Sequence, residues 1–235
     1  MQLYFIQPIA EPIPCQVNLD SEESFHCVKV LRMRSGDPIH LTDGNGNLYE
    51  GRLLLADTKK CTVMVEMVHA ETGKRPFRLH LAVAPTKNMA RFEWFLEKAT
   101  EIGVDEITPL VCEHSERVQL RVDRLRKIIL SAAKQSLKTY LPVLHEPVKF
   151  TDFVSRNNSG ARFVAYVEEQ QPMHLKAAYQ KGDCTVFIGP EGDFSHKEME
   201  LAIKSGIIPV SLGPSRLRTE TAAMVACHII NMVNE

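Results

Sequence analysis

Thr185-Val-Phe-Ile-Gly-Pro-Glu-Gly192 and Ile208-Pro-Val-Ser-Leu-Gly213 are two apolar segments that each end in a glycine-bearing loop, and the second continues into Arg218-Thr-Glu-Thr-Ala222. Each apolar segment predicts a buried strand. In an open α/β sheet, ligands bind at the carboxyl ends of the strands, where glycine lets main-chain groups approach a ligand without an intervening Cβ atom. The sequence therefore predicts a small-molecule pocket built mainly from backbone.

Length and composition fit a globular protein. The chain has 235 residues, of which 44% are hydrophobic, enough for one large domain or two smaller ones. Its six cysteines are scattered without a C-x-x-C pair or a His/Cys cluster at metal spacing, so we expect no disulfide, no metal and a reducing, cytoplasmic location. The amino-terminal segment has no basic export-signal region, and the longest apolar stretch, 221–233, is too short to span a bilayer. No membrane partner is expected.

The chain divides near residues 71–76. Before this point the pattern is typical of strands: the turn signal Asp43-Gly-Asn-Gly46 precedes a predicted return strand over 48–55, and apolar residues alternate over 61–67. We expect residues 1–72 to form a small β-barrel or sandwich.

Residues 73–235 alternate predicted strands with predicted helices. The strands are 79–84, 106–111, 162–167, 185–188 and 208–213; the helices include 92–102, a basic helix after 117, one opened by the capping box Ser195-His-Lys-Glu198, and a last one from Thr219 or Thr221. Such alternation is typical of an α/β fold with a mainly parallel sheet covered on both faces.

Basic residues gather between 117 and 138, although the net charge of −1 argues against a protein that coats nucleic acid. Two interpretations of this run remain open, a phosphate-facing surface and a solvated helix face. The same choice applies to Lys29-Val-Leu-Arg-Met-Arg34, which is either a second contact surface or an ordinary short helix.

Common catalytic motifs are missing. The sequence contains no G-x-G-x-x-G dinucleotide fingerprint, no P-loop and no G-x-S-x-G nucleophile elbow. Its nine histidines are dispersed, and only His114 lies beside other polar residues at a predicted strand end. A lone histidine is more often structural than catalytic.

Several short motifs are spread over nearly the whole chain. They are Lys87-x3-Arg91-x-Glu93, Lys98-Ala-Thr-Glu-Ile-Gly103, Gln135-Ser136, Ile188-Gly-Pro-Glu-Gly192, Leu212-Gly-x3-Leu-Arg-Thr-Glu-Thr-Ala222 and, near the amino terminus, Val30-Leu-Arg-Met-Arg34 with Gly36-Asp37. Together they resemble the RsmE family of ribosomal RNA methyltransferases.

That resemblance implies a SPOUT-class fold. A PUA-like, RNA-binding β-barrel over 1–72 would precede a methyltransferase domain over 73–235, whose residues from about 160 to 235 would form a deep trefoil knot, a rare exception to unknotted topology. Family members use S-adenosylmethionine to methylate N3 of one uridine, position 1498 in standard small-subunit (16S) rRNA numbering. They act as homodimers on the small ribosomal subunit, and no metal is implied.

The resemblance also assigns residues. Cofactor binding falls on a strand end and two loops: Val167, Glu168, Ile188, Gly189, Pro190, Glu191, Gly192, Val210, Ser211, Leu212, Gly213, Leu217, Arg218 and Thr219. RNA binding falls on the basic residues Arg32, Arg34, Lys87, Arg91, Arg124, Lys134 and Lys138.

Methylation at N3 sets its own chemical demands. Uracil N3 carries a proton on the base-pairing edge, so the base must be unpaired or flipped and must lose that proton. We expect Arg218, beside a helix amino terminus, to stabilise the resulting negative charge. Glu191 or Glu220 is the candidate proton acceptor, and the alternative for Glu220 is favourable placement in a first helical turn.

Five positions depart from the usual family pattern. Asp193 replaces a common glycine, Ser215-Arg216 alters an Arg-Ile pair, His114 replaces an arginine and Lys134 replaces a glutamate. Two further hypotheses stay open: another knotted methyltransferase acting on tRNA or on a ribose 2′-hydroxyl, and a non-catalytic RNA-binding protein of ribosome assembly.

Overall fold

The computed structural model describes residues 2–156, 160–166 and 172–235. Its contacts define two units: residues 1–74 with 133–141, and residues 75–132 with 142–235. Segment 133–141 therefore lies with the first unit, although the sequence pattern grouped it with the second. Hydrogen bonds explain this, since the Leu141 amide donates to the Gly44 carbonyl at 2.8 Å and the Gly46 amide donates to the Thr139 carbonyl at 2.9 Å.

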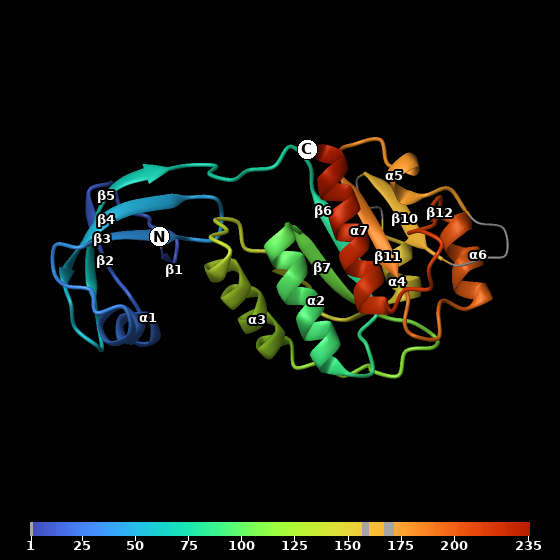
Figure 1. The fold of residues 1–235 in the computed structure, drawn as a ribbon, viewed down its shortest axis with the longest axis horizontal. Helices are drawn as coiled ribbons and strands as arrows, with labels where there is room; N and C mark the ends of the chain where they lie inside the picture. Colours follow the sequence, from blue (N-terminus) through green and yellow to red (C-terminus); the bar gives the residue numbers. More distant parts are fainter. Residues whose placement is uncertain (1, 157–159, 167–171) are drawn as a thin grey trace. The chain divides into compact units, whose positions relative to one another are not determined.

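The first unit is built on one five-stranded sheet (Figure 1). Its strands, in spatial order, are β1 (Leu3–Phe5), β3 (Pro38–Thr42), β4 (Leu48–Leu55), β5 (Thr62–His69) and β2 (Cys15–Asn18). β1 runs parallel to β3, and the other pairs are antiparallel. The helical segments α1 (Ser21–Phe25) and η1 (His26–Val30) follow β2. The β3–β4 hairpin turns over residues 43–46, as predicted.

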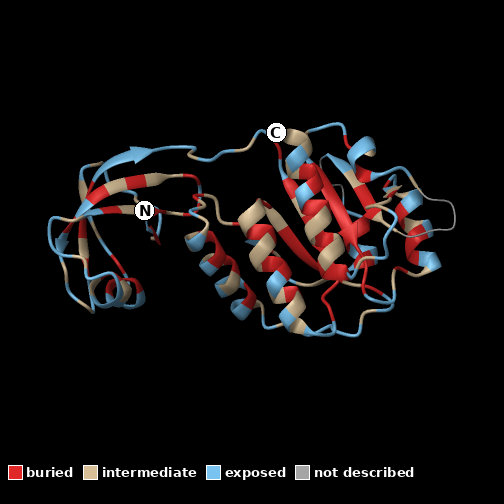
Figure 2. Cartoon of the chain, in the orientation of Figure 1, coloured by how far each residue is buried: buried red, intermediate tan, exposed pale blue. Residues whose placement is uncertain are grey.

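The second unit contains a parallel sheet, as the sequence predicts. Its strands, in spatial order, are β12 (Ile208–Val210), β10 (Ala161–Ala165), β11 (Cys184–Ile188), β6 (Leu79–Val83), β7 (Glu106–Val111) and β8 (Val143–Leu144), while β9 (Val148–Lys149) pairs with the end of β7. Each pairing is parallel. The strand interiors are buried (Figure 2), which explains their almost continuous apolar sequence.

Helices pack on this sheet. α2 (Met89–Ile102) and α7 (Thr219–Asn234) lie side by side, and α7 also contacts β6 and β11 (Figure 1). α4 (Phe150–Val154) and α6 (His196–Lys204) share a core with Ala82, Val164 and Phe187 of the sheet. α3 (Val122–Gln135) is the basic helix, and α5 (Leu175–Ala178) is a single turn.

Several helix ends are where the sequence places them. Ser195 and Glu198 form the predicted capping box of α6, Gly103 ends α2 with a φ of 126°, and α7 begins at Thr219. Within the described residues, no helix is long and apolar enough to cross a membrane.

Candidate active site

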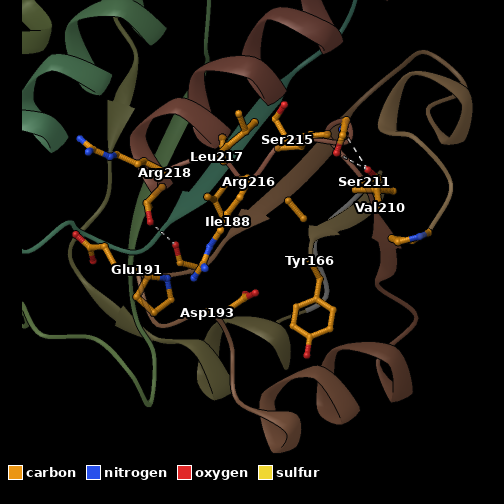
Figure 3. Close-up of a pocket in the computed structure, with 18 of the residues that line it drawn as sticks. Tyr166, Ile188, Glu191, Asp193, Val210, Ser211, Ser215, Arg216, Leu217 and Arg218 are labelled. Atoms are coloured by element: carbon orange, nitrogen blue, oxygen red, sulfur yellow. Dashed lines mark hydrogen bonds between the residues drawn. The ribbon is translucent and has the colours of Figure 1, made fainter. Parts of the chain in front are cut away.

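A cavity of about 700 Å³ opens at the carboxyl ends of β10, β11 and β12 (Figure 3). This volume is in the range of small-molecule sites, and the position agrees with the rule for open parallel sheets. Its lining comes from three segments: Ala165, Tyr166 and Pro172; Ile188, Gly189, Pro190, Glu191 and Asp193; and Val210, Ser211, Leu212, Gly213, Pro214, Ser215, Arg216, Leu217, Arg218, Thr219 and Ala222.

The loop after β11 is held close to the start of α7. The Thr219 hydroxyl donates to the Gly189 carbonyl at 3.0 Å, and this bond is buried. A Cβ atom at Gly189 would lie 3.1 Å from the Phe194 ring, so a side chain there would require the ring to move. Glycine thus permits this loop to pack closely against Phe194.

The loop after β12 is shaped by its own polar groups. The Ser211 hydroxyl accepts a hydrogen bond from the Gly213 amide at 3.1 Å and lies 3.2 Å from the Gly213 carbonyl. Gly213 has a φ of 126°, a conformation that other residues rarely adopt. On its outer side, the Ser211 amide donates to the Met173 carbonyl at 3.0 Å. These bonds fix the loop that forms one wall of the cavity.

His114 supports the loop after β11 by contacts with its backbone. Its Nδ1 lies 3.1 Å from the Gly192 carbonyl oxygen and 3.0 Å from that of Asp193. Because both partners are acceptors, Nδ1 carries the proton that donates to them. His114 therefore has a positioning role for the Gly189–Asp193 loop, which the sequence left undecided.

Asp193 is a charged group at the cavity wall. Its Oδ1 accepts a hydrogen bond from the Phe194 amide at 2.8 Å. Burial raises the pKa of the Asp193 carboxyl, while the Phe194 amide and the nearby charge of Arg216 act in the opposite direction. In Figure 3 the two loop arginines extend in different directions, Arg216 toward Asp193 and Arg218 away from it.

Arg218 is the N-cap residue of α7, and its side chain is exposed. Within the described residues it makes no capping hydrogen bond with that side chain. The guanidinium thus stands beside the positive end of a helix of 16 residues. This is a site where a developing negative charge would be stabilised.

The two candidate carboxylates occupy different environments. Glu191 lines the cavity, and its Oε1 accepts a hydrogen bond from the Lys87 amide at 2.9 Å. Glu220 is buried and is not among the residues lining the cavity. Its Oε1 lies 3.8 Å from Nε of Arg91, and its Oε2 has no hydrogen-bond partner among the described residues.

Most of the residues that the sequence assigned to the cofactor line this cavity: Ile188, Gly189, Pro190, Glu191, Val210, Ser211, Leu212, Gly213, Leu217, Arg218 and Thr219. Gly192 is not among the lining residues, and an added Cβ atom there would lie 3.0 Å from the His114 side chain. Val167 and Glu168 lie outside the described residues. The sequence did not assign Ala165, Tyr166, Pro172, Asp193, Pro214, Ser215, Arg216 or Ala222 to the cofactor, although Ala165 and Tyr166 lie in the predicted strand 162–167.

Some of the expected RNA-binding residues are exposed, and others already form ion pairs with carboxylates of the protein. Arg32 and Arg34 are exposed, Arg91 faces Glu220, and Lys138 is half-buried. Lys87 pairs with Glu116 at 2.7 Å and Arg124 pairs with Glu93 at 2.7 Å. Lys134 forms an ion pair with Glu23 inside the first unit. A structural role accounts for Lys134, one of the residues that depart from the family pattern.

Comparisons with known proteins extend over both units. A family model described as an RNA methyltransferase domain matches residues 73–231, and one described as an RNA methyltransferase PUA domain matches residues 19–66. Two proteins named ribosomal RNA small subunit methyltransferase E are similar to the chain. The one from Synechocystis sp. is 30% identical (95% of this chain, 75% of the relative), and the one from Bacillus subtilis is 26% identical (100% and 98%).

Solved structures agree. A probable rRNA-methyltransferase from Porphyromonas gingivalis is 39% identical, with a TM-score of 0.91 over 100% of this chain and 98% of that one. A methyltransferase from Legionella pneumophila in complex with the bound cofactor SAM is 29% identical, with a TM-score of 0.85 over 98% and 96%. With a PUA-like domain ahead of an α/β methyltransferase domain, the chain belongs to the RsmE family of small-subunit ribosomal RNA methyltransferases.

Proposed function

We propose that the protein uses S-adenosylmethionine to methylate N3 of the uridine at position 1498 (standard 16S numbering) of small-subunit ribosomal RNA. The backbone-lined cavity at the carboxyl ends of β10, β11 and β12 carries this proposal. The names of the relatives support an rRNA substrate, and the Legionella structure supports the cofactor. When bound, S-adenosylmethionine supplies an electrophilic methyl group on a positively charged sulfur.

The residues of the cavity fit this cofactor. Ile188, Val210 and Leu217 offer apolar surface for its flat base. The carboxylates of Glu191 and Asp193 favour its positive charges, and the main chain of the two loops offers hydrogen-bonding groups. We expect these residues, with Ser211, Leu212 and Gly213, to hold the cofactor.

The remaining work falls to the residues around the cavity mouth. Arg218 and the amino terminus of α7 stabilise the negative charge that spreads over uracil O2 and O4 when N3 loses its proton. For the proton acceptor we favour Glu191 over Glu220, because Glu191 is exposed and is one of the residues that line the cavity, whereas the Glu220 carboxylate is buried beside Arg91. The base must be flipped out of any pairing to reach this position.

We propose that basic residues of both units bind the rRNA backbone. Arg32 and Arg34 in the first unit are exposed, and Lys87, Arg91 and Arg124 lie around the start of α2 in the second. A ribosomal substrate places the protein in the cytoplasm. Lys134 is a weaker candidate for RNA binding than the exposed Arg32 and Arg34, because it is already paired with Glu23.

Finer features of assembly and topology are part of the same proposal. A stripe on α7, Thr221, Val225, His228 and Met232, is only partly covered by the protein's own chain, which supports a homodimer. Light scattering would measure the mass of the protein in solution and so test the homodimer. We further propose that the first-unit sheet closes as a barrel and that residues from about 160 onward form a trefoil knot, both to be tested by an experimental structure with bound S-adenosylhomocysteine.

Mass mapping of the modified nucleotide tests the function. Unmodified small subunits are incubated with protein and methyl-labelled S-adenosylmethionine, and the rRNA is digested and mapped. We expect N3-methyluridine at position 1498, and none with Arg218→Ala. A methyl group on a ribose or on tRNA would instead favour another knotted methyltransferase. No cofactor binding by calorimetry would favour a non-catalytic RNA-binding protein.

A further inference from the structure

Three potential metal ligands lie together at one end of the parallel strands, opposite to the end at which the cavity opens. His80 is the second residue of β6, Glu106 opens β7 and His145 directly follows β8. One donor atom from each of the three lies within 4.8 Å of the other two. The cluster plays no part in the proposed methyl transfer, because the cavity lies at the carboxyl ends of the strands.

The strand register explains why these side chains converge. His80 is the direct partner of Glu106 in the parallel β6–β7 ladder, and Glu106 is the partner of Val143 in β8. Side chains alternate along a strand, so His145, two residues after Val143, projects to the same face. The three residues come from separate strands, which is why no metal-binding spacing is visible in the sequence.

Neighbouring groups hold the three side chains in place. Glu106 Oε1 accepts a hydrogen bond from Arg78 Nη2 at 2.7 Å, and its Oε2 lies 2.8 Å from His145 Nε2. The His80 ring is 2.7 Å from the Thr108 hydroxyl through Nε2, and it packs against the Phe153 ring with centroids 5.3 Å apart. Each of the three residues is partly accessible, so an ion from solvent can reach them.

We propose that His80, Glu106 and His145 bind one Zn²⁺ ion. Two imidazoles and one carboxylate are a typical zinc ligand set, and water completes a tetrahedron. In such a site neighbouring donors are about 3.4 Å apart, given metal–ligand distances of about 2.1 Å. The present donor atoms all lie within 4.8 Å of one another, and Glu106 Oε2 and His145 Nε2 are 2.8 Å apart. The ion replaces the His145–Glu106 hydrogen bond and joins β6, β7 and the end of β8.

Arg78 provides a specific signature of this arrangement. Its guanidinium lies against Glu106 and is largely exposed, so its positive charge opposes a cation at the site. Removing this charge should strengthen metal binding, whereas removing a ligand should weaken it. A role of the cluster in packing alone would not predict opposite effects on zinc affinity.

Zinc titration of the metal-free full-length protein against a chromophoric indicator tests the proposal. We expect one equivalent to bind, at least tenfold weaker binding for Glu106→Gln and His145→Gln, and tighter binding for Arg78→Gln. His69→Gln is the matched control, because His69 pairs with Glu50 at 3.2 Å in the first unit. Its zinc affinity should equal that of the unchanged protein. Circular dichroism verifies that each variant is folded.

Cobalt substitution identifies the donor atoms. Visible spectra of the Co²⁺ protein should lack a thiolate charge-transfer band, since the proposed ligands are nitrogen and oxygen. A thiolate band would assign the ion to one of the free cysteines and overturn the proposal. Failure of the unchanged protein to bind zinc, or full binding by Glu106→Gln and His145→Gln, would overturn it as well.

Discussion

Asp193 holds a backbone conformation that glycine adopts most easily. Its φ is 61°, in the left-handed region where aspartate and asparagine are the best-tolerated residues with side chains. The Asp193 carboxylate also accepts a hydrogen bond from the Phe194 amide, and the His114 ring donates one to the Asp193 carbonyl. Two departures from the family pattern, Asp193 and His114, thus support the same loop.

Changing Asp193 to asparagine should stabilise the protein at neutral pH. Burial raises the pKa of Asp193 above its usual value of 3.8, so its contribution to stability is complete below that value and is lost as pH rises through the folded-state pKa. Asparagine keeps the acceptor oxygen and tolerates the same φ, but it carries no charge to desolvate. Thermal unfolding should show a Tm increase of about 1–2 °C at pH 7 and none near pH 3. A Tm decrease at pH 7 would show that the charge is favourable.

Arg218 and Arg216 should differ in which step they affect. Arg218→Ala should abolish methyl transfer while leaving cofactor affinity within about tenfold, because its proposed work is on charge in the transition state. Arg216→Ala is the matched variant. The Arg216 side chain extends toward Asp193 in the cavity (Figure 3), so its loss should change cofactor affinity. Single-turnover rates and calorimetry measure the two effects, and an active Arg218→Ala would remove Arg218 from the mechanism.

At the scale of elements, the start of α6 is tied to the end of β7. Glu198 Oε2 accepts the Ser195 amide at 2.9 Å, which completes the capping box. Its Oε1 accepts the Glu113 amide, also at 2.9 Å. A single buried carboxylate therefore caps one helix and fixes the chain that leads to His114. The contact with the Glu113 amide thus links α6 to the segment whose His114 supports the loop after β11.

Removing the Glu198 carboxylate should be more costly than removing the Ser195 hydroxyl. Glu198→Ala leaves two amides without their acceptor and should lower the free energy of unfolding by about 2–4 kcal/mol. Ser195→Ala removes one capping bond and should cost about 1 kcal/mol. Glu200→Ala, which removes an exposed pair with Lys204, is the control and should cost less than about 0.5 kcal/mol. Urea unfolding measures all three, and equal losses for the first two would contradict a double role of Glu198.

The sequence predicted those elements whose physical signal is local. Strands β6, β7 and β11 are buried runs of five or six apolar-rich residues, and α2 and α6 have clear caps. Two-residue β8 and β9 and the one-turn α5 are too short to show a period, and their positions depend on tertiary pairing. The two glycine loops of the site were also predictable, because each directly follows an apolar strand and is marked by its own glycines.

Other parts of the site could not be derived from local sequence. Pro172 and Ala222 both line the cavity, Ala222 from the first turn of α7, and no local pattern marks either residue. The environment of Glu220 was equally hidden, because only packing of α7 against α2 places it beside Arg91. Spacing also could not predict the His80–Glu106–His145 cluster, which depends on the register of three strands.

For the whole molecule, charge decides how RNA can be bound. The net charge is only −1, so attraction to phosphate must come from local groups. Four of the basic candidates, Lys87, Arg91, Arg124 and Lys134, are already in ion pairs. The exposed arginines of the first unit, Arg32 and Arg34, are therefore the better candidates for phosphate contacts.

Neutralising Arg32 and Arg34 together should weaken RNA binding and flatten its salt dependence. Each phosphate contact contributes about 0.7–0.9 to the slope of log affinity against log salt, so the double change to glutamine should reduce the slope by about 1.4–1.8. The exposed pair Lys59 and Lys60 of the same unit, changed to glutamine, is the matched control for net charge. Fluorescence anisotropy with an rRNA fragment over a range of salt gives both slopes, and calorimetry verifies that cofactor affinity is unchanged. If the arginine variant keeps the slope of the unchanged protein, Arg32 and Arg34 have structural roles, and the phosphate contacts must lie in the second unit.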